Sequence, residues 1–326
     1  MINFLSCDWG TTSFRLRLIE TESQATRAEV LSNRGIAAMH QDWLNQGLPE
    51  NERFDFYLVF LRTQIHELEK KWNHSLKATP LLISGMASSS IGMMALDYLP
   101  MPFHCDAANI RTKLIGPSES FPNPLILISG AKTVNDVMRG EETLLIGCDT
   151  DSTIPEQYFI FPGTHSKHIL VRNGIAVDLK TFMTGEIFEL LARNSILSAS
   201  LPENIQVDAA RNSLHFEKGI KKGRDSNLLN AVFQVRTNQL LKQLTRDENY
   251  LYLSGLLIGY ELSALKNSAA DPVVLVCGAN LKEYYQAALI GSGFKLQIVD
   301  ADEALIRGQS RIAAQILNQS FSHHKP

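Results

Sequence analysis

Apolar and polar residues alternate at the start of the chain. Apolar residues at 14, 16 and 18 alternate with Arg15 and Arg17, which is the two-residue period of a half-buried strand. The run at 2–5 is also strand-like, and Gly10-Thr11-Thr12 separates the two runs. The pattern therefore predicts a hairpin with a polar turn that contains glycine.

The same pattern returns half a chain later. Tyr158–Phe161 is an apolar run, and the turn Pro162–Lys167 separates it from a second run at His168–Val171. Beyond this run, Asn173-Gly174 is a strong hairpin signal. Two equivalent hairpins, each opening one half of the chain, indicate a duplicated site.

Strand patterns alternate with helix patterns along the rest of the chain. Further strands are expected at 28–31, 81–85, 125–130, 272–277 and 295–299. Helices are expected at 37–44, 57–72, 133–147, 228–244, 254–266 and 302–317, as well as one that ends near 194 and one that begins at 281. Residues 198–225 are polar and give no clear assignment. This alternation predicts an α/β fold with sites at the carboxyl ends of strands.

The bulk composition sets the class of protein. A chain of 326 residues allows about two domains. Asp, Thr, Ser and Pro concentrate at 148–156, so we expect domains at 1–150 and 151–326. The net charge of −3 with scattered basic residues argues against a nucleic-acid partner.

No run is apolar enough to span a bilayer, and the first residues lack the features of a signal peptide. The four cysteines lie far apart in apolar surroundings, which is typical of buried thiols in a reducing cytoplasm. We therefore expect a cytoplasmic protein without a membrane partner. Assembly into a homodimer stays open.

The two polar turns have the chemistry of a phosphate site. Backbone N–H groups and hydroxyls suit phosphate oxygens, and a neighbouring carboxylate suits a magnesium ion held through water. The residues expected to bind phosphate are Gly10, Thr11, Thr12, Gly163, Thr164, His165, Ser166 and Lys167, with Asp8 for the metal. The alternatives are a plain hairpin with a polar tip, a structural His165 and a Lys167 that only covers its strand.

A third segment fits the rest of a nucleotide. Gly278-Ala279-Asn280 follows an apolar strand and opens a helix, where a glycine lets a base or ribose approach the backbone. Gly185 and Glu186 open another helix and are expected to hold the ribose, with simple helix capping as the alternative.

These three pieces, in this order, resemble the ATPase superfamily of sugar kinases, actin and the heat-shock seventy-kilodalton proteins. Six blocks across nearly the whole chain are similar to signatures of the 2-dehydro-3-deoxygalactonokinase family. They are Asp8–Thr12, Ser84–Met86, Asp136–Thr143, Pro162–Lys167, Thr181–Glu186 and Gly255–Gly259.

The resemblance implies two actin-like (ribonuclease H-like) ATPase lobes with mixed sheets and an interlobe cleft. It places the sugar acid on the N-terminal lobe and ATP on the C-terminal lobe, with the last helix packing back on the first lobe. It also implies the reaction, which is phosphorylation of 2-dehydro-3-deoxy-D-galactonate at O6 with ATP and Mg²⁺ in galactonate breakdown.

Asp136 is the expected catalytic base. If the helix at 133–147 forms, Asp136 lies in its first turn, where the helix N-terminus stabilises a carboxylate that accepts the hydroxyl proton. Asn135-Asp136 is also similar to the catalytic Asn-Asp of bacterial glucokinases. A cap of its own helix is the alternative role, and Glu141 and Asp8 are weaker candidates for the base.

The sugar acid needs a cation for its carboxylate. Arg15 and Arg139 are the expected cations, with Lys167 and His165 also near the motifs and a plain surface role as the alternative for Arg15. Ser84, Gly85 and Met86 at the end of a strand are expected to line the same site. After Met86 the chain departs from the family pattern, which leaves the contacts to the sugar acid open.

Two other functions compete with this one. The first is a different sugar or sugar-acid kinase, or a phosphohydrolase, on the same fold. The second is an ATP-dependent switch without catalysis.

Overall fold

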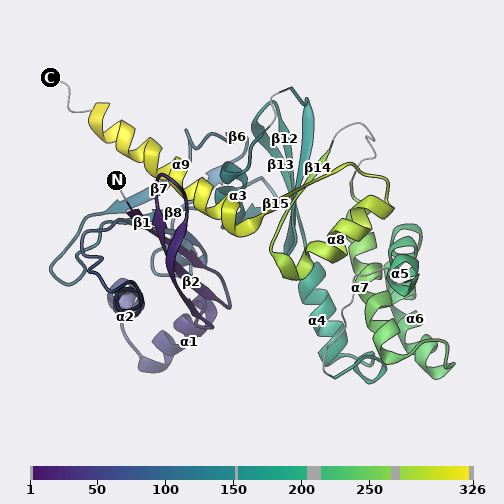
Figure 1. Cartoon of the computed structure of the whole chain (residues 1–326). Helices are drawn as coiled ribbons and strands as arrows, with labels where there is room; N and C mark the ends of the chain where they lie inside the picture. Colours follow the sequence, from purple (N-terminus) through teal and green to yellow (C-terminus); the bar gives the residue numbers. More distant parts are fainter. Residues whose placement is uncertain (1–2, 151–152, 204–213, 266–271, 323–326) are drawn as a thin grey trace. The chain divides into compact units, whose positions relative to one another are not determined.

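The computed structural model describes residues 3–150, 153–203, 214–265 and 272–322, with only the backbone given for 317–322. The chain divides into two compact units (Figure 1). The first comprises Met1–Ser152, Asn173–Leu179 and Ala301–Pro326, and the second comprises Thr153–Arg172 and Lys180–Asp300. Within the predicted joint at 148–156, residues 151–152 lie outside the described residues.

A mixed six-stranded sheet forms the middle of the first unit. Its strands lie in the order β3-β2-β1-β4-β8-β7. β1 pairs antiparallel with β2 and parallel with β4, and β8 continues the parallel part. The bounds are β1 (Asn3–Trp9), β2 (Phe14–Glu20), β3 (Thr26–Ser32), β4 (Leu81–Gly85), β7 (Thr112–Ile115) and β8 (Leu125–Ile128).

Helices cover both faces of this sheet (Figure 1). Leu5, Cys7 and Trp9 of β1 pack with α1 (Ile36–Gln46) and α2 (Arg53–Trp72). Phe4 belongs to the opposite core, with α3 (Glu141–Gly147) and α9 (Ala301–Ser322). Because side chains alternate along a strand, Asp8 lies on the same side as Phe4, the side of α3 and α9.

Short strands complete the first unit. β5 (Leu99–Pro100), β9 (Ala131–Lys132) and β10 (Val137–Met138) form a small sheet. β6 (Phe103–His104) pairs with the start of β13 (Ile175–Phe182). Three short 3-10 helices also occur in the described chain, η1 (Glu50–Glu52) and η2 (Met86–Ser88) here and η3 (Ser198–Ser200) in the second unit.

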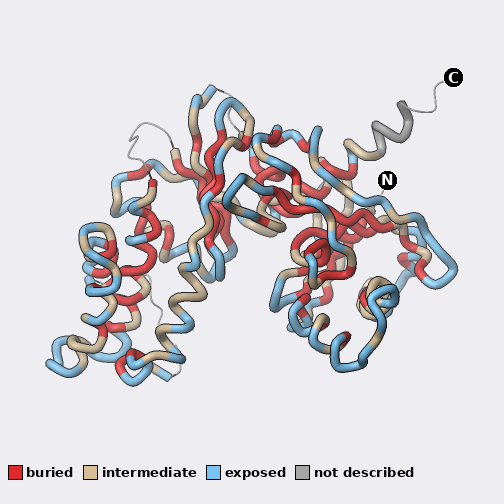
Figure 2. The backbone as a smooth tube through the Cα atoms, turned by 180° about the vertical axis from the view of Figure 1, so that it is seen from behind, coloured by how far each residue is buried: buried red, intermediate tan, exposed pale blue. Residues whose placement is uncertain are grey.

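A second mixed sheet, with neighbours in the order β15-β14-β11-β12, forms the middle of the second unit. Helices pack against it through Ile160, Leu275 and their neighbours, and buried residues follow the strands and the inner helix faces (Figure 2). The strands are β11 (Glu156–Phe161), β12 (Ser166–Arg172), β14 (Val273–Cys277) and β15 (Leu296–Asp300). The helices are α4 (Thr184–Asn194), α5 (Leu214–Asp225), α6 (Leu228–Leu240), α7 (Arg246–Leu262) and α8 (Ala279–Gly291).

The predicted α/β architecture with two mixed sheets is confirmed, and most expected strands and helices are present. The expected start of a helix at Ser254 is wrong, because α7 begins at Arg246 behind a capping box made by Thr245 and Glu248. The helix ends at Leu262, before the expected end near residue 266. The expected helix at 133–147 is wrong in its first half, which is described with the site below, and its second half is confirmed as α3.

None of the described helices is long and apolar enough to cross a lipid bilayer.

Candidate active site

The first polar turn is closed and tied to a helix. The Gly10 N–H donates to the Ser13 carbonyl oxygen at 2.9 Å, and the carbonyl oxygens of Gly10 and Thr11 accept the first N–H groups of α1, both at 3.0 Å. A Cβ on Gly35 would lie 2.3 Å from the Thr11 carbonyl oxygen, so α1 packs directly on the turn. The carbonyls therefore face the helix, and Thr11, Thr12 and Ser13 are exposed.

Asp8 lies at the carboxyl end of β1, beside the end of β4. In the parallel pairing, Asp8 is opposite Ser84 and Trp9 is opposite Gly85. Gly85 has a φ of 92°, and a Cβ there would lie 2.7 Å from the Trp9 carbonyl oxygen. Only glycine fits this close approach, so the Ser84-Gly85 pair brings β4 directly against the strand that carries Asp8.

Charged side chains surround Asp8. Burial raises the pKa of the Asp8 carboxyl, the positive charges of Arg15 and Arg17 oppose this rise, and the negative charges of Asp302 and Glu141 add to it. The net rise comes from burial, which is the largest of these causes. A divalent cation would stabilise the ionised carboxyl, and one or two carboxylates plus phosphate oxygens are the usual ligands of Mg²⁺. Asp8 therefore fits the metal role predicted for it, although the described residues contain no group of three His, Cys, Asp or Glu side chains suited to hold a metal.

Arg15 is already in an ion pair. Its guanidinium donates to Asp302 Oδ1 at 2.9 Å, and Arg17 donates to Asp302 Oδ2 at 2.6 Å and to Glu29 at 2.6 Å. These pairs fix the first turn of α9 next to β2. The Arg15 side chain is 42% exposed, so it remains accessible to a ligand.

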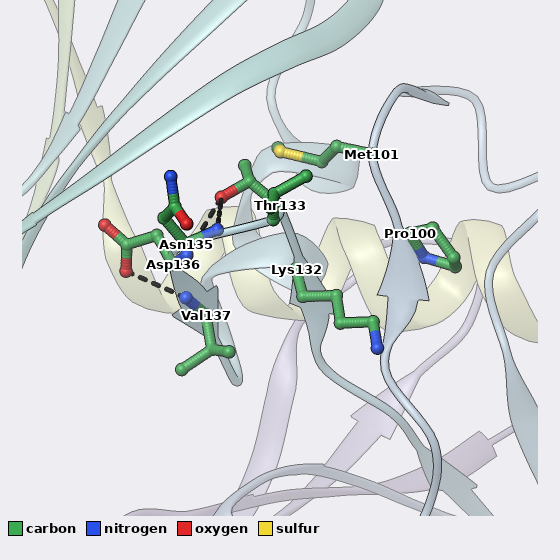
Figure 3. Close-up of a pocket in the computed structure, with 8 residues that line it drawn as sticks. Pro100, Met101, Lys132, Thr133, Asn135, Asp136 and Val137 are labelled. Atoms are coloured by element: carbon green, nitrogen blue, oxygen red, sulfur yellow. Dashed lines mark hydrogen bonds between the residues drawn. The ribbon is translucent and has the colours of Figure 1, made fainter.

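The segment before α3 is a turn and not a helix. Thr133 Oγ1 accepts the backbone N–H groups of Asn135 at 3.2 Å and Asp136 at 2.9 Å, and Asp136 Oδ1 accepts the Val137 N–H at 2.8 Å (Figure 3). These side chains form hydrogen bonds with neighbouring backbone N–H groups, and such bonds replace the backbone hydrogen bonds that a helix would form. β10 follows at once, and Gly140 has a φ of 109°, so α3 begins only at Glu141.

Asp136 is therefore not in the first turn of a helix, and the helix-dipole argument for its role is wrong. Its carboxylate points away from Lys132 in the close-up (Figure 3). Asp136 lines an open hollow in the first unit together with Pro100, Met101, Lys132, Thr133, Val134, Asn135 and Val137.

The chain bends at Arg139 and Gly140, between β10 and α3, and this corner brings Arg139 to the end of β4. The Arg139 guanidinium donates to Ser88 Oγ at 2.5 Å and lies 4.3 Å from the centre of the Tyr98 ring. Ser88 belongs to η2, which begins at Met86, and a Cβ on Gly140 would lie 3.5 Å from Gly85 Cα. The structure thus brings together the predicted sugar-acid residues Ser84, Gly85, Met86 and Arg139.

The carboxylates of Glu141 and Glu142 accept hydrogen bonds from the backbone of this corner. Glu141 Oε2 accepts the Arg139 N–H at 3.0 Å, and Glu142 Oε2 accepts the Gly140 N–H at 2.8 Å. Burial first, and then the charge of Glu141, raise the pKa of Glu142 to about 7. No role for Glu142 was predicted from the sequence, although its place near Gly140 in the Arg-Gly-Glu-Glu segment is a signal that could have identified it.

The second polar turn packs on the start of α4. A Cβ on Gly185 would lie 2.6 Å from the Gly163 carbonyl oxygen, and the Glu186 N–H donates to the Thr164 carbonyl oxygen at 3.0 Å. His165 Nε2 lies 2.5 Å from Glu186 Oε2. The predicted phosphate turn and the predicted ribose residues, Gly185 and Glu186, therefore form one cluster.

Residues of the second turn differ in exposure. Thr164 and His165 are exposed, and Ser166 and Lys167 are buried. Lys167 Nζ donates back to the His165 carbonyl oxygen at 2.8 Å, so its charge lies at the turn.

A cavity opens beside this cluster within the second unit. Three tyrosines and several apolar side chains line it with the two glycines of the cluster. Its lining residues are Gly163, Thr184, Gly185, Phe188, Tyr250, Ser254, Leu257, Ile258, Leu281, Tyr284 and Tyr285. The aromatic residues were not predicted from the sequence, because their helical spacing is equally typical of a core.

The predicted adenosine contacts at Gly278–Asn280 lie at the start of α8. Gly278 precedes the helix in an extended conformation, and all three residues are exposed. Leu281, one residue further along α8, lines the cavity, so the segment lies at its margin.

The Gly255–Gly259 block has a packing role. A Cβ on Gly255 would lie 2.1 Å from the Phe216 carbonyl oxygen, and one on Gly219 would lie 2.2 Å from the Tyr252 carbonyl oxygen. Helices α5 and α7 therefore cross with their backbones in contact.

Comparisons with known proteins give matches over nearly the whole chain. The sequence profile of the family described as 2-keto-3-deoxy-galactonokinase matches residues 8–312. A protein of Rhizobium meliloti named as a 2-dehydro-3-deoxygalactonokinase, DgoK1, is 32% identical over 324 residues, which cover 96% of this chain and 97% of that protein. The 2-dehydro-3-deoxygalactonokinase of Escherichia coli K12 is 28% identical over 325 residues, 97% of this chain and 99% of that one.

A solved structure is also similar. The crystal structure of a Sinorhizobium meliloti protein, described as a 2-dehydro-3-deoxygalactonokinase, superimposes with a TM-score of 0.76 at 30% identity. The match covers 96% of both chains.

Proposed function

The chain belongs to the 2-keto-3-deoxy-galactonokinase family, and from this membership we propose that it transfers the γ-phosphoryl group of ATP to O6 of 2-dehydro-3-deoxy-D-galactonate. The carbohydrate-kinase activity predicted from the sequence is confirmed by the family match. The observation that carries the proposal is the extent of this match, because residues 8–312 include the polar turns of both units.

The first unit is proposed to bind the sugar acid. Arg139, held by Ser88 and the Tyr98 ring, is a fixed cation beside the Ser84–Met86 segment. Arg15 is proposed as a second cation for the substrate carboxylate, since it remains partly exposed while paired with Asp302.

The second unit is proposed to bind ATP. The turn at Gly163–Lys167 offers backbone N–H groups, the Thr164 hydroxyl and the Lys167 ammonium to phosphate oxygens. The predicted phosphate contact of the Ser166 hydroxyl is not proposed, because that hydroxyl is buried and donates to Glu261. The tyrosine-lined cavity offers flat apolar walls to an adenine base, with Gly185 and Glu186 near the ribose and Gly278, Ala279 and Asn280 at the margin.

The turn at Gly10, Thr11 and Thr12 is proposed as the second phosphate grip, and Asp8 as the residue that holds Mg²⁺. When bound, this ion would neutralise the charge that develops on the phosphate oxygens. Asp136 is proposed to accept the proton of the substrate hydroxyl. As it does so, the hydroxyl oxygen forms a bond to the γ-phosphorus of ATP, and the bond from that phosphorus to ADP breaks. A cytoplasmic location and a homodimer stay predictions.

A panel of acceptors tests the proposal. ADP release is measured with 2-dehydro-3-deoxygalactonate, its gluconate-derived epimer, simple aldoses and no sugar. We expect the galactonate-derived acid to give a kcat/KM at least about tenfold above the others, because a site that hydrogen-bonds one hydroxyl rejects its epimer. ADP release without any sugar would point to a phosphohydrolase, and no release with any acceptor would favour a switch without catalysis.

A further inference from the structure

A buried carboxylate lies behind the cavity of the second unit. Glu261 is in the last turn of α7 and is 1% exposed. It does not line the cavity, and neither the phosphate turn nor the ribose cluster includes it. A buried carboxylate is costly unless its oxygens are fully hydrogen-bonded, so its contacts need a reason.

Four side chains donate to this carboxylate. Glu261 Oε1 accepts from Ser166 Oγ at 2.7 Å and from His168 Nε2 at 2.9 Å. Glu261 Oε2 accepts from the Tyr285 hydroxyl at 2.7 Å and from Thr184 Oγ1. Two donors per oxygen fill the acceptor sites of a carboxylate. Burial raises the pKa of Glu261, but the hydrogen bonds from His168, Thr184 and Ser166 more than offset this, so the pKa is lowered.

The donors come from the elements that form the proposed nucleotide site. Ser166 directly follows the exposed residues of the second turn, and Thr184 is the first residue of α4, next to Gly185. Tyr285 of α8 lines the cavity, as do Thr184 and Gly185. One buried group on α7 therefore joins the turn, the start of α4 and the wall formed by α8.

We propose that Glu261 is a positioning residue for the nucleotide, which fixes these three elements in the arrangement that ATP binds. The proposal rests on the assignment of ATP to this unit. Glu261 acts through its partners and touches neither substrate. Its loss should therefore weaken nucleotide binding while leaving sugar-acid binding unchanged, because all its contacts lie within the second unit.

The test replaces the carboxylate with an amide of nearly the same shape. In Glu261→Gln an NH₂ group replaces one of the two carboxylate oxygens. This hydrogen-bond donor then faces two side chains that are also donors. The Kd of ADP is measured by titration calorimetry without sugar acid, and the KM values of both substrates are measured by ADP release. We expect the Kd of ADP and the KM of ATP to rise about tenfold, and the KM of the sugar acid to change less than about twofold.

Asn249→Ala is the matched control. Asn249 is also fully buried on α7, but at its other end, where it donates to the carbonyl oxygens of Ser200 and Val235. We expect this variant to lose stability without a change in the Kd of ADP. If both variants weaken ADP binding in proportion to their loss of unfolding free energy, Glu261 has only a structural role and the proposal is wrong.

A second pair of variants tests the role of Glu261 if Glu261→Gln does not fold. His168→Leu removes one donor to Glu261 and His168→Gln restores an N–H at a similar reach. We expect weaker ADP binding in the first and recovery to within about twofold in the second. Equal affinities in both variants and the wild type overturn the proposal.

Failure of the proposal is distinguishable from failure of the proposed function. If the wild type phosphorylates the sugar acid and the folded Glu261→Gln variant binds ADP with unchanged affinity, only the role proposed for Glu261 is wrong. If the folded wild type binds no ADP, both the assignment of ATP to this unit and the role of Glu261 are wrong.

Discussion

Asp136 is the residue on which the proposed proton transfer depends. Its backbone is fixed by Thr133 Oγ1, and its own Oδ1 accepts the Val137 N–H, so the side chain has a defined orientation at the rim of a hollow. We expect Asp136→Asn to lower kcat about 10²- to 10⁴-fold, because an amide cannot accept the hydroxyl proton. Steady-state ADP release should show a change of less than about threefold in the KM of ATP.

Val134→Ala is the control for this change. Val134 lies in the same turn and is 98% exposed, so its truncation removes little packing. Its kcat should stay within about twofold of the wild type. A folded Asp136→Asn variant with normal turnover would transfer the role of base to another group, with Glu141 and Asp8 as the next candidates.

Residue types were easier to predict than their partners. The sequence identifies Arg15 as a cation near the first turn, but Asp302, its partner, is 287 positions away. Likewise, Ser166 and Glu261 are 95 positions apart. Such pairs depend on the tertiary fold, and no local pattern indicates them.

At the scale of elements, the crossing of α5 and α7 explains a glycine-rich block that resembles a functional motif. Gly219 and Gly223 of α5 face Gly255 and Gly259 of α7, and a Cβ on any of the four would lie within 2.3 Å of a backbone oxygen of the other helix. Because α7 also carries Glu261, this crossing holds the helix behind the cavity.

Gly255→Ala should destabilise the protein for this reason. The added methyl would lie 2.1 Å from the Phe216 carbonyl oxygen, so the helices must separate. We expect the free energy of unfolding to fall by about 2–3 kcal/mol, which lowers the Tm by about 5–10 °C in a thermal unfolding experiment.

Gly291→Ala serves as its control. Gly291 is also helical, and a Cβ there would meet nothing within 4 Å. Its effect should stay within about 0.5 kcal/mol, since alanine is the better helix former. If the two variants are equally stable, the close crossing does not determine the packing.

Periodicity predicted elements well where one pattern dominated. The strands of both hairpins and the long helix at 57–72 follow directly from the spacing of apolar residues. The helix predicted at 133–147 is wrong in its first half, because Thr133 and Asp136 satisfy the backbone of a turn and Gly140 adopts a positive φ. Those residues favour a helix start in sequence and a turn in the structure, and only the tertiary context separates the two.

At the scale of the whole molecule, each unit carries half of the proposed chemistry. The first contains Asp8 with the arginines and the Ser84–Met86 segment, and the second contains the turn at Gly163 with its cavity. The repeated hairpins led to a predicted division between residues 150 and 151, whereas the first unit also contains residues 173–179 and 301–326. The composition of the cavity could not be predicted, since its residues come from helices far apart in sequence.

Product analysis tests the central claim most directly. The wild-type chain is incubated with ATP, Mg²⁺ and 2-dehydro-3-deoxy-D-galactonate, and the products are identified by ³¹P and ¹H NMR. We predict one phosphomonoester per ADP formed, with its phosphorus coupled to the protons on C6. Inorganic phosphate as the sole phosphorus product besides ADP, or an ester at another carbon, would contradict the account.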